Sequence, residues 1–369
     1  MRRLKVVAVL LGVAAMMALA ACGSSKSNSS SSTSGGSNTT ASSSRAVSID
    51  VGLGRPIVVH TNKPRIAFLG TSGNLLLKAQ IQGVQDEAKA RGVDLTVFDS
   101  KFDPTVQMQQ VQNALQQKRF DAFIVVPLDS NAMCPVLTRQ AVAQGIPVVT
   151  NNVPLCNRVS KPEGDQLWSP GTIAHVGWTA TVDANRSMYR EVNRRVGPGV
   201  HTAALLVGPP LIGGTISSIA ALRQSEAAGE IPHLNVKYVI NTDFTTPDGL
   251  AKTQTLLQAH PDVDTIMTIY SDTTIGAIKA VQAAGKEGKV KLYDQGASGQ
   301  SLAAIRAGQL EMTTAFFPYT FGKQAVDAVV DAFEGKRVPR WIGQYVQGST
   351  PGNPLVIDKS NINSFRPEY

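Results

Sequence analysis

The sequence predicts an α/β protein built from two doubly wound parallel-sheet lobes. Short continuous apolar runs, such as 123–126, alternate with longer segments that have helical periodicity. This alternation stops in an irregular stretch at 154–170 and then starts again. The chain has 369 residues, more than one hydrophobic core usually supports, so we expect two domains of the same class.

The first series of elements starts at residue 65. The helix after its first strand carries apolar side chains on one face, at Leu77, Ile81, Val84 and Ala88. Asp103 and Pro104 predict the start of the next helix, because Asp caps helix N-termini and Pro fits the first turn. A third helix begins at Cys134 and ends before Gly145. The expected strands are 65–69, 95–98, 122–126 and 146–149.

The second series repeats this pattern after the irregular stretch. Its expected strands are 174–177, 202–207, 236–240, 265–269, 290–293 and 312–316. Its expected helices are 183–195, 216–229, 247–259, 273–285 and 299–307, with one more at 321–334 after the last strand.

The N-terminus has the parts of a secretory signal: Arg2, Arg3 and Lys5, then an apolar run too short to span a membrane stably. Residues 19–22 resemble the lipoprotein processing box, in which the peptidase cuts before a cysteine, here Cys22, whose thiol carries a diacylglycerol. The alternative is an ordinary signal with an incidental Cys. We therefore expect a signal peptide at 1–21 and an exported protein anchored by lipid to the outer face of the bacterial cell membrane. Residues 23–45 are almost all polar, so we assign 22–63 to a flexible tether.

The charge does not indicate a nucleic-acid partner. Removing the three basic residues of the signal lowers the formal net charge from +8 to +5. The remaining basic residues are scattered among acidic ones, which is typical of a solvated surface.

Two further cysteines, Cys134 and Cys156, lie on either side of one helix–strand unit. In an exported protein such a pair can form a disulfide; the alternative is two buried thiols. A catalytic or metal-binding cysteine would need nearby histidines, and none is close in sequence.

The sequence carries no phosphate-binding loop, nucleophile elbow, zinc-protease motif or paired Cys-x-x-Cys. We therefore expect no enzyme activity, no cofactor and no metal. Gly213-Gly214-Thr215 before a helix offers only a weak anion-binding alternative. Asp272 is the clearest candidate for a helix cap.

Polar residues instead recur where strands end, the edge at which open α/β sheets bind ligands. They are Thr71, Ser72, Asn74, Asn151, Asn152, Tyr270, Ser271, Asp272, Asp294 and Gln295. Their recurrence in both lobes predicts a ligand cleft.

Over residues 64–350 the chain resembles the type I periplasmic sugar-binding proteins, the ribose-binding-protein group of ABC importers. The resemblance rests on segments such as 66–69 with Asn74, 123–130, 145–150, 259–263 and 292–294. It implies two lobes joined by three hinge crossings that close on a ligand. The lobes would be 64–178 with 318–345 and 179–317 with 346–357, followed by a C-terminal tail at 358–369.

The family's ligand contacts carry over unevenly. The resemblance implies that Asn74 matches the family's ligand asparagine and that Phe244 matches an aromatic side chain that packs on the sugar ring. It implies that Asp294 matches a carboxylate that accepts hydrogen bonds from sugar hydroxyls. At other positions the family has polar or aromatic ligand contacts, and this chain instead has Leu76, Leu77, Asn152, Tyr270 and Phe316. The replacements remove hydrogen-bonding capacity, so the resemblance implies a ligand with fewer hydroxyls or an apolar face: a deoxy-sugar, a polyol or a small furanone-type signal. Phe317, Tyr319 and Trp178 are further aromatic candidates.

The leading hypothesis is a monomeric, lipid-anchored solute-binding protein that binds a sugar or sugar-like small molecule and delivers it to an ABC importer permease. A sensory lipoprotein that presents its ligand state to a membrane receptor is the alternative. A transcription regulator with this body would need an N-terminal helix-turn-helix, where this chain has a signal and a tether.

Overall fold

The computed structural model describes residues 46–161, 164–177, 180–343 and 355–369. Cys22, the signal peptide and Trp178 lie outside the described residues. Among the described helices, none is long and apolar enough to cross a membrane.

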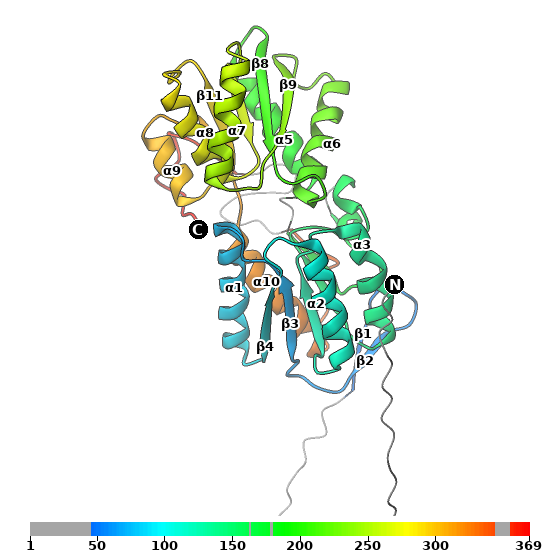
Figure 1. Cartoon of the computed structure of the whole chain (residues 1–369). Coiled ribbons are helices and arrows are strands. Elements are labelled where there is room, and N and C mark those ends of the chain that lie inside the picture. Colours follow the sequence, from blue (N-terminus) through cyan, green and yellow to red (C-terminus); the bar gives the residue numbers. More distant parts are fainter. Residues whose placement is uncertain (1–45, 162–163, 178–179, 344–354) are drawn as a thin grey trace, which may run out of the picture. The chain divides into compact units, whose positions relative to one another are not determined.

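The first sheet has six parallel strands in the order β13-β7-β6-β5-β3-β4, of which Figure 1 labels the neighbours β3 and β4. They are β3 (Ile66–Gly70), β4 (Leu95–Asp99), β5 (Ala122–Val125), β6 (Val148–Asn151), β7 (Ala174–Val176) and β13 (Trp341–Ile342). Its helices are α1 (Leu75–Arg91), α2 (Pro104–Gln117), α3 (Ser130–Pro135) and α10 (Pro318–Phe333). A π-helical segment (Val136–Gln140) and α4 (Ala141–Ala143) continue from α3.

The second sheet has the order β14-β12-β11-β10-β8-β9, with β14 antiparallel to β12 and the other pairs parallel. Its strands are β8 (His201–Val207), β9 (Leu234–Asn241), β10 (Thr265–Thr268), β11 (Lys291–Gly296), β12 (Met312–Ala315) and β14 (Val356–Ile357). Its helices are α5 (Val182–Val196), α6 (Gly213–Ala227), α7 (Thr246–Ala259), α8 (Ser271–Ala283) and α9 (Gly299–Arg306). The two sheets confirm the predicted fold class.

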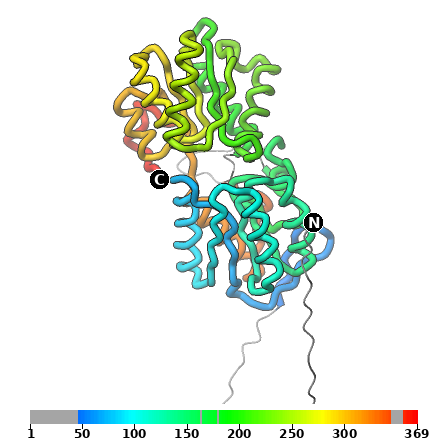
Figure 2. Tube along the Cα trace, in the orientation of Figure 1, coloured from blue at the N-terminus to red at the C-terminus, as the bar shows by residue number. Residues whose placement is uncertain are grey.

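Alternation along the strands explains why the first sheet is covered on both sides. Ile66 and Phe68 belong to the core cluster that includes α1 and α10, whereas Ala67 and Leu69 belong to the cluster with α2 and α3. Side chains two residues apart share one face of a strand, so a continuous apolar run supplies both faces. The chain returns to this lobe after β12, which sets α10 beside α1 (Figure 2).

Residues 46–63 do not form the expected tether. They contain an antiparallel hairpin of β1 (Val47–Ile49) and β2 (Ile57–Val59), whose Ile49, Ile57 and Val59 are buried. Alternating apolar residues give this hairpin one buried face, a pattern that the polar segment before it obscures. Arg340 fixes the hairpin by donating to the Asp50 backbone carbonyl at 2.8 Å and to its carboxylate at 2.5 Å.

The C-terminal residues 358–369 form a packed segment and not a free tail. Ile362 and Phe365 are buried, and the Phe365 ring lies 6.2 Å from that of Phe317. The Glu368 carboxylate accepts a hydrogen bond from Thr320 N at 3.1 Å, at the start of α10. The backbone carbonyl of Tyr369 accepts one from Gly299 N at 2.7 Å, at the start of α9.

Two local predictions are wrong. The third helix begins at Ser130, capped by Asp129, so Cys134 lies near the end of α3 and not at its start. Asp272 lies in the first turn of α8, and Tyr270 takes the N-cap position. Asp103 caps α2 as expected, because its carboxylate accepts from Thr105 N at 2.7 Å and from Val106 N at 3.1 Å.

Candidate functional site

A cavity lies where the carboxyl ends of strands in both sheets face one another. About 650 Å³ of empty space lies within it, including space open to solvent, and about 80 Å³ of this can hold the centre of a water-sized molecule. The first lobe lines it with Asn74, Leu76, Leu77, Phe102, Val126, Pro127, Leu128, Asn152 and Val153. The rest of its described lining is Ala180, Asn185, Ile212, Gly214, Phe244, Ile269, Tyr270, Gln295 and Phe316. This is the edge at which open α/β sheets bind ligands.

Seven of the eight predicted ligand residues line this cavity: Asn74, Leu76, Leu77, Asn152, Phe244, Tyr270 and Phe316. They come from five different connections that follow strands of the two sheets. The fold therefore assembles one surface from residues up to 242 positions apart in the chain.

Aromatic rings form one wall of the cavity. The rings of Phe102 and Phe244, from different lobes, lie 6.1 Å apart, and those of Phe244 and Tyr270 lie 5.2 Å apart in an edge-to-face arrangement. Sequence reasoning missed Phe102. Its signal is its place directly after the second strand of the first lobe, at the same sheet edge as Asn74.

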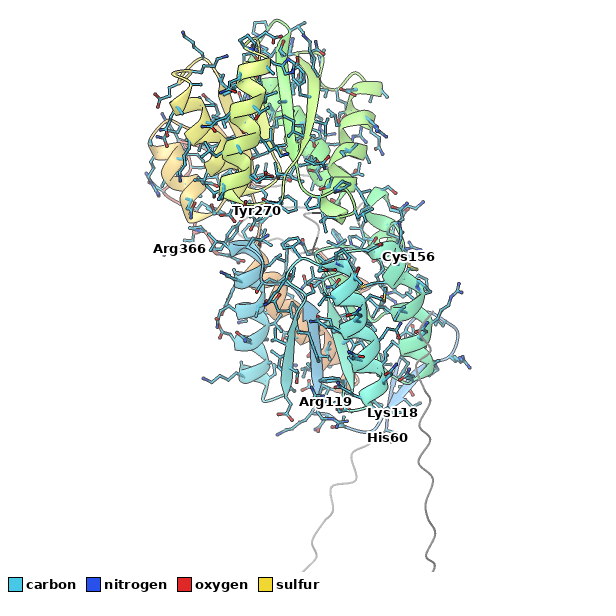
Figure 3. The ribbon with its side chains drawn as sticks, in the orientation of Figure 1. His60, Lys118, Arg119, Cys156, Tyr270 and Arg366 are labelled. Carbon is cyan, nitrogen blue, oxygen red and sulfur yellow. A yellow bond between two sulfur atoms is a disulfide. The ribbon has the colours of Figure 1, made fainter. Side chains whose placement is uncertain are left out.

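Tyr270 joins the two lobes directly. Its hydroxyl accepts a hydrogen bond from Leu76 N at 3.1 Å, and Figure 3 shows Tyr270 between the lobes. Burial is the main cause that raises the pKa of Tyr270 well above its usual value, and the charges of Tyr369 and Asp272 add to the shift. The phenol is therefore protonated at neutral pH. Its oxygen is the hydrogen-bond partner of Leu76 N, which lies in the first turn of α1.

Asn74 has a structural role besides lining the cavity. Its Oδ1 caps α1 by accepting from Leu77 N at 2.9 Å. The side-chain amide group of Asn74 is thus oriented by the helix that follows it, and the Nδ2 donors are the atoms it can offer to a ligand.

Asp294 is absent from the described cavity lining, which corrects the role that the resemblance gave it. Successive side chains of a strand point to opposite faces, and in β11 it is the next residue, Gln295, that lines the cavity. The fully buried carboxylate of Asp294 accepts hydrogen bonds from five hydroxyls of its own lobe. These donors are Ser301 at 2.5 Å, Thr274 at 2.7 Å, Ser271 and Thr313 at 3.1 Å each, and Thr268 at 3.4 Å.

Burial raises the pKa of Asp294 to about 6, although hydrogen bonds from the surrounding hydroxyls favour its charged form and act in the opposite direction. The phenol of Tyr369 is the neighbouring titratable group, and its pKa is raised well above the usual value, chiefly by burial. Asp294 is therefore a structural carboxylate that organises the ends of β11, β12, α8 and α9.

Several other predicted strand-end residues also lie away from the cavity. Asn151 is fully buried beside α1 and α10, where it accepts from Gln80 Nε2 at 2.7 Å and donates to the Phe321 carbonyl at 3.0 Å. Phe317 packs 6.4 Å from Phe321, and Tyr319 donates its hydroxyl hydrogen to Asp86 at 2.9 Å. The described lining of the cavity likewise does not include Thr71, Ser72, Ser271 or Asp272.

A disulfide anchors one loop of the site. The structure joins Cys134 in α3 to Cys156, with the two Cα atoms 5.0 Å apart. Cys156 N also donates to the Ser130 carbonyl at 3.2 Å. These links hold the loop that begins with Asn152 and Val153 against the first lobe. The described residues contain no cluster of three or more His, Cys, Asp or Glu side chains that could hold a metal ion.

The amino-acid sequence of the chain is similar to those of known binding proteins. The family model described as a periplasmic binding protein domain matches residues 68–337. The ribose import binding protein of Bacillus subtilis is 26% identical over 276 residues, which cover 74% of this chain and 83% of that protein. The xylitol-binding protein of Mycolicibacterium smegmatis is 21% identical, over 71% of this chain and 70% of that protein.

Solved structures agree on the fold. A periplasmic ribose ABC transporter protein from Conexibacter woesei has a TM-score of 0.63 at 26% identity, covering 82% of this chain and 94% of that chain. A solute-binding protein from Bacillus halodurans with bound myo-inositol has a TM-score of 0.70 at 19% identity, covering 84% of this chain and all of that one.

Proposed function

Because this chain belongs to the periplasmic binding protein family, we propose that it is the extracytoplasmic solute-binding component of an ABC importer, and that it binds a sugar or a sugar-like polyol. The cavity that both lobes line is the single observation that carries this proposal. Its place at the carboxyl edges of two parallel sheets suits a small polar solute with an apolar face. We propose no catalytic activity, since the relatives named above are binding proteins.

The mechanism we propose is hinge closure around the ligand. The first lobe comprises 64–178 and 318–345, with the hairpin at 46–63 added to it, and the second comprises 179–317 and 346–357. The hydrogen bond from Leu76 N to Tyr270 and the Phe102–Phe244 contact join lobes beside the cavity. A ligand that fills the cavity supports both contacts, so it shifts the protein toward the closed form that a permease recognises.

We further propose that Cys22 carries a lipid anchor and that the protein acts as a monomer at the outer face of the membrane. The motif at 19–22 and the polar segment after it support the anchor. Metabolic labelling with radioactive palmitate of cells that express the wild type or Cys22→Ala tests this: we expect label on the wild type and none on the variant. A wild-type protein without label, or equal label on the two, would refute the anchor.

A thermal-shift screen of the purified protein tests the binding function. The probes are D-ribose, D-allose, xylitol and myo-inositol, each from micromolar to millimolar concentration. A ligand at 100 times its Kd stabilises the folded state by about 2.7 kcal/mol, which is readily measured as a rise in Tm. Absence of any rise in Tm with these probes and with D-galactose, D-mannose and their 6-deoxy forms would refute a sugar-binding function.

If binding is found, uptake measurements separate import from sensing. Deletion of the gene should reduce uptake of the bound sugar if the protein serves a permease. Normal uptake, with loss of a sugar-induced transcriptional response, would instead support the sensory alternative.

A further inference from the structure

The described cavity lining contains no Asp, Glu, Lys, Arg or His. Its polar side chains are the amides of Asn74, Asn152, Asn185 and Gln295 and the phenol of Tyr270. The other lining residues are apolar apart from backbone atoms. A charged ligand would lose its hydration here without meeting an opposite charge, so this lining favours an uncharged one.

Asn185 is the amide whose orientation the surrounding structure fixes most fully. It lies in the first turn of α5 and is 1% exposed. Its Nδ2 donates to the Thr181 carbonyl at 2.7 Å and to Ser217 Oγ at 3.3 Å. Ser217 in turn donates to the Gly214 carbonyl at 3.0 Å, so its Oγ is free to accept from Asn185. A carbonyl oxygen cannot donate, which means that the nitrogen of Asn185 must face Thr181.

This orientation leaves the oxygen of Asn185 without a partner. Both Nδ2 hydrogens are used, whereas the buried Oδ1 has no hydrogen-bond partner among the residues that the structure describes. Buried polar atoms are nearly always paired, and an unpaired one beside a cavity indicates a group that arrives with a ligand. An acceptor pairs with a donor, and the donor that an uncharged sugar-like molecule offers is a hydroxyl.

Apolar side chains surround the rest of the cavity. Leu76, Leu77, Phe244 and Phe316 are buried residues of its wall. A ligand with hydroxyls on every face would leave some of them unpaired against these side chains, at a cost in affinity. A ligand with a methyl group or a ring face free of hydroxyls would match this wall.

We propose that the cavity takes an uncharged small molecule with one apolar face, and that a hydroxyl of this ligand donates a hydrogen bond to Oδ1 of Asn185. The proposal deepens the proposed function and rests on the same cavity being the ligand site. Asn185 is then a specificity-determining residue that lies in the first turn of a helix, away from the strand-end positions that sequence reasoning considered.

Isothermal titration calorimetry of the purified protein tests the ligand class with matched pairs of sugars. The pairs are D-galactose with D-fucose, D-mannose with D-rhamnose, and D-ribose with 2-deoxy-D-ribose. A non-sugar probe, trans-1,2-cyclohexanediol, has hydroxyls and an apolar ring. We expect the deoxy member of at least one pair to bind at least tenfold more tightly than its parent, since one methyl-sized apolar contact is worth about 10-fold or more.

The best-binding probe is then titrated into Asn185→Leu, which keeps the volume and removes the acceptor. We expect its affinity to fall at least tenfold. The control is Asn193→Leu, a change on the same helix at a residue whose Oδ1 accepts from His233 N at 2.8 Å away from the cavity lining. This variant should keep wild-type affinity even if its Tm falls.

The outcomes separate this inference from the proposed sugar-binding function. Parents that bind as tightly as their deoxy partners in every pair, or an Asn185→Leu affinity within twofold of wild type, would overturn this inference and leave sugar binding intact. Binding of the cyclohexanediol alone, lost in Asn185→Leu, would support this inference and refute the binding of a sugar. No binding by any probe would overturn both.

Discussion

Asp294 and Gln295 are neighbours in β11 with opposite surroundings, so substitutions at the two positions should have different effects. The buried carboxylate of Asp294 has a pKa of about 6 in the folded protein and 3.8 as its ordinary value. Between these values the folded state binds more protons than the unfolded state. The free energy of unfolding contributed by this group is therefore highest below about pH 4 and is lost as the pH rises through about 6.

The magnitude follows from the shift. One pKa unit corresponds to about 1.4 kcal/mol, so the full loss between low pH and neutral pH is about 3 kcal/mol. About 2 kcal/mol of it falls between pH 4.5 and pH 7.5 by the same linkage. Asp294→Asn keeps the shape of the side chain and removes the titration. As the pH rises from 4.5 to 7.5, we therefore expect the free energy of unfolding of the variant to increase by about 2 kcal/mol relative to that of wild type.

Urea unfolding at four pH values from 4.5 to 7.5 measures this difference. Other groups with raised pKa values, such as Asp327, titrate in both proteins and cancel in the comparison. Gln295→Ala is the matched control: it should show the pH dependence of the wild type and lose the stabilisation by ligand. If the free energy of unfolding of wild type and Asp294→Asn changes equally with pH, the buried, raised-pKa state of Asp294 is refuted. If the ligand stabilises Gln295→Ala as much as wild type, the place of Gln295 in the ligand site is refuted.

Three further predictions concern the elements that support the site. Replacing Cys134 and Cys156 by Ser should lower the free energy of unfolding by about 3 kcal/mol, because the bridge closes a loop between residues 22 apart; an unchanged urea midpoint would contradict this. Gly322→Ala should cost about 2 kcal/mol, because its Cβ would lie 2.3 Å from the Gln80 carbonyl, whereas Gly214→Ala, with no atom within 4 Å, should melt like wild type. Glu368→Ala should cost about 1 kcal/mol by removing the acceptor that caps Thr320 N, with the exposed Glu311→Ala as control; equal melting temperatures would argue against the cap.

The fold could be predicted because its strands are continuous apolar runs and its helices have one apolar face. In β5, for example, all four residues are buried, as a sheet covered on both sides requires. The hairpin of β1 and β2 was missed because three-residue strands with a single buried face carry a weak signal. Its burial depends on Arg340, which is 290 positions away from Asp50 in sequence.

The site could be predicted only as far as strand ends indicate it. Asn74, Asn152 and Tyr270 directly follow or nearly follow strands, and all three line the cavity. The face of a strand is harder to assign, since a shift by one residue exchanges the two sides. Both Asp294 and Gln295 are strand-end candidates and the resemblance favours Asp294, whereas in the structure Gln295 lines the cavity. Asn185 gave no sequence signal, because its importance comes from Thr181 and Ser217 using its two donors.

The residues that join the lobes and the residues that line the cavity are largely the same. Tyr270 lines the cavity and accepts from Leu76 N of the other lobe, and Phe102 and Phe244 meet across the cavity wall. A change in any of these residues therefore alters both ligand contact and lobe closure. A ligand can shift the closed population only by the difference between its affinities for the closed and open forms. In this protein that difference depends on contacts made by both lobes at once, so affinity and closure should change together in every variant of these residues.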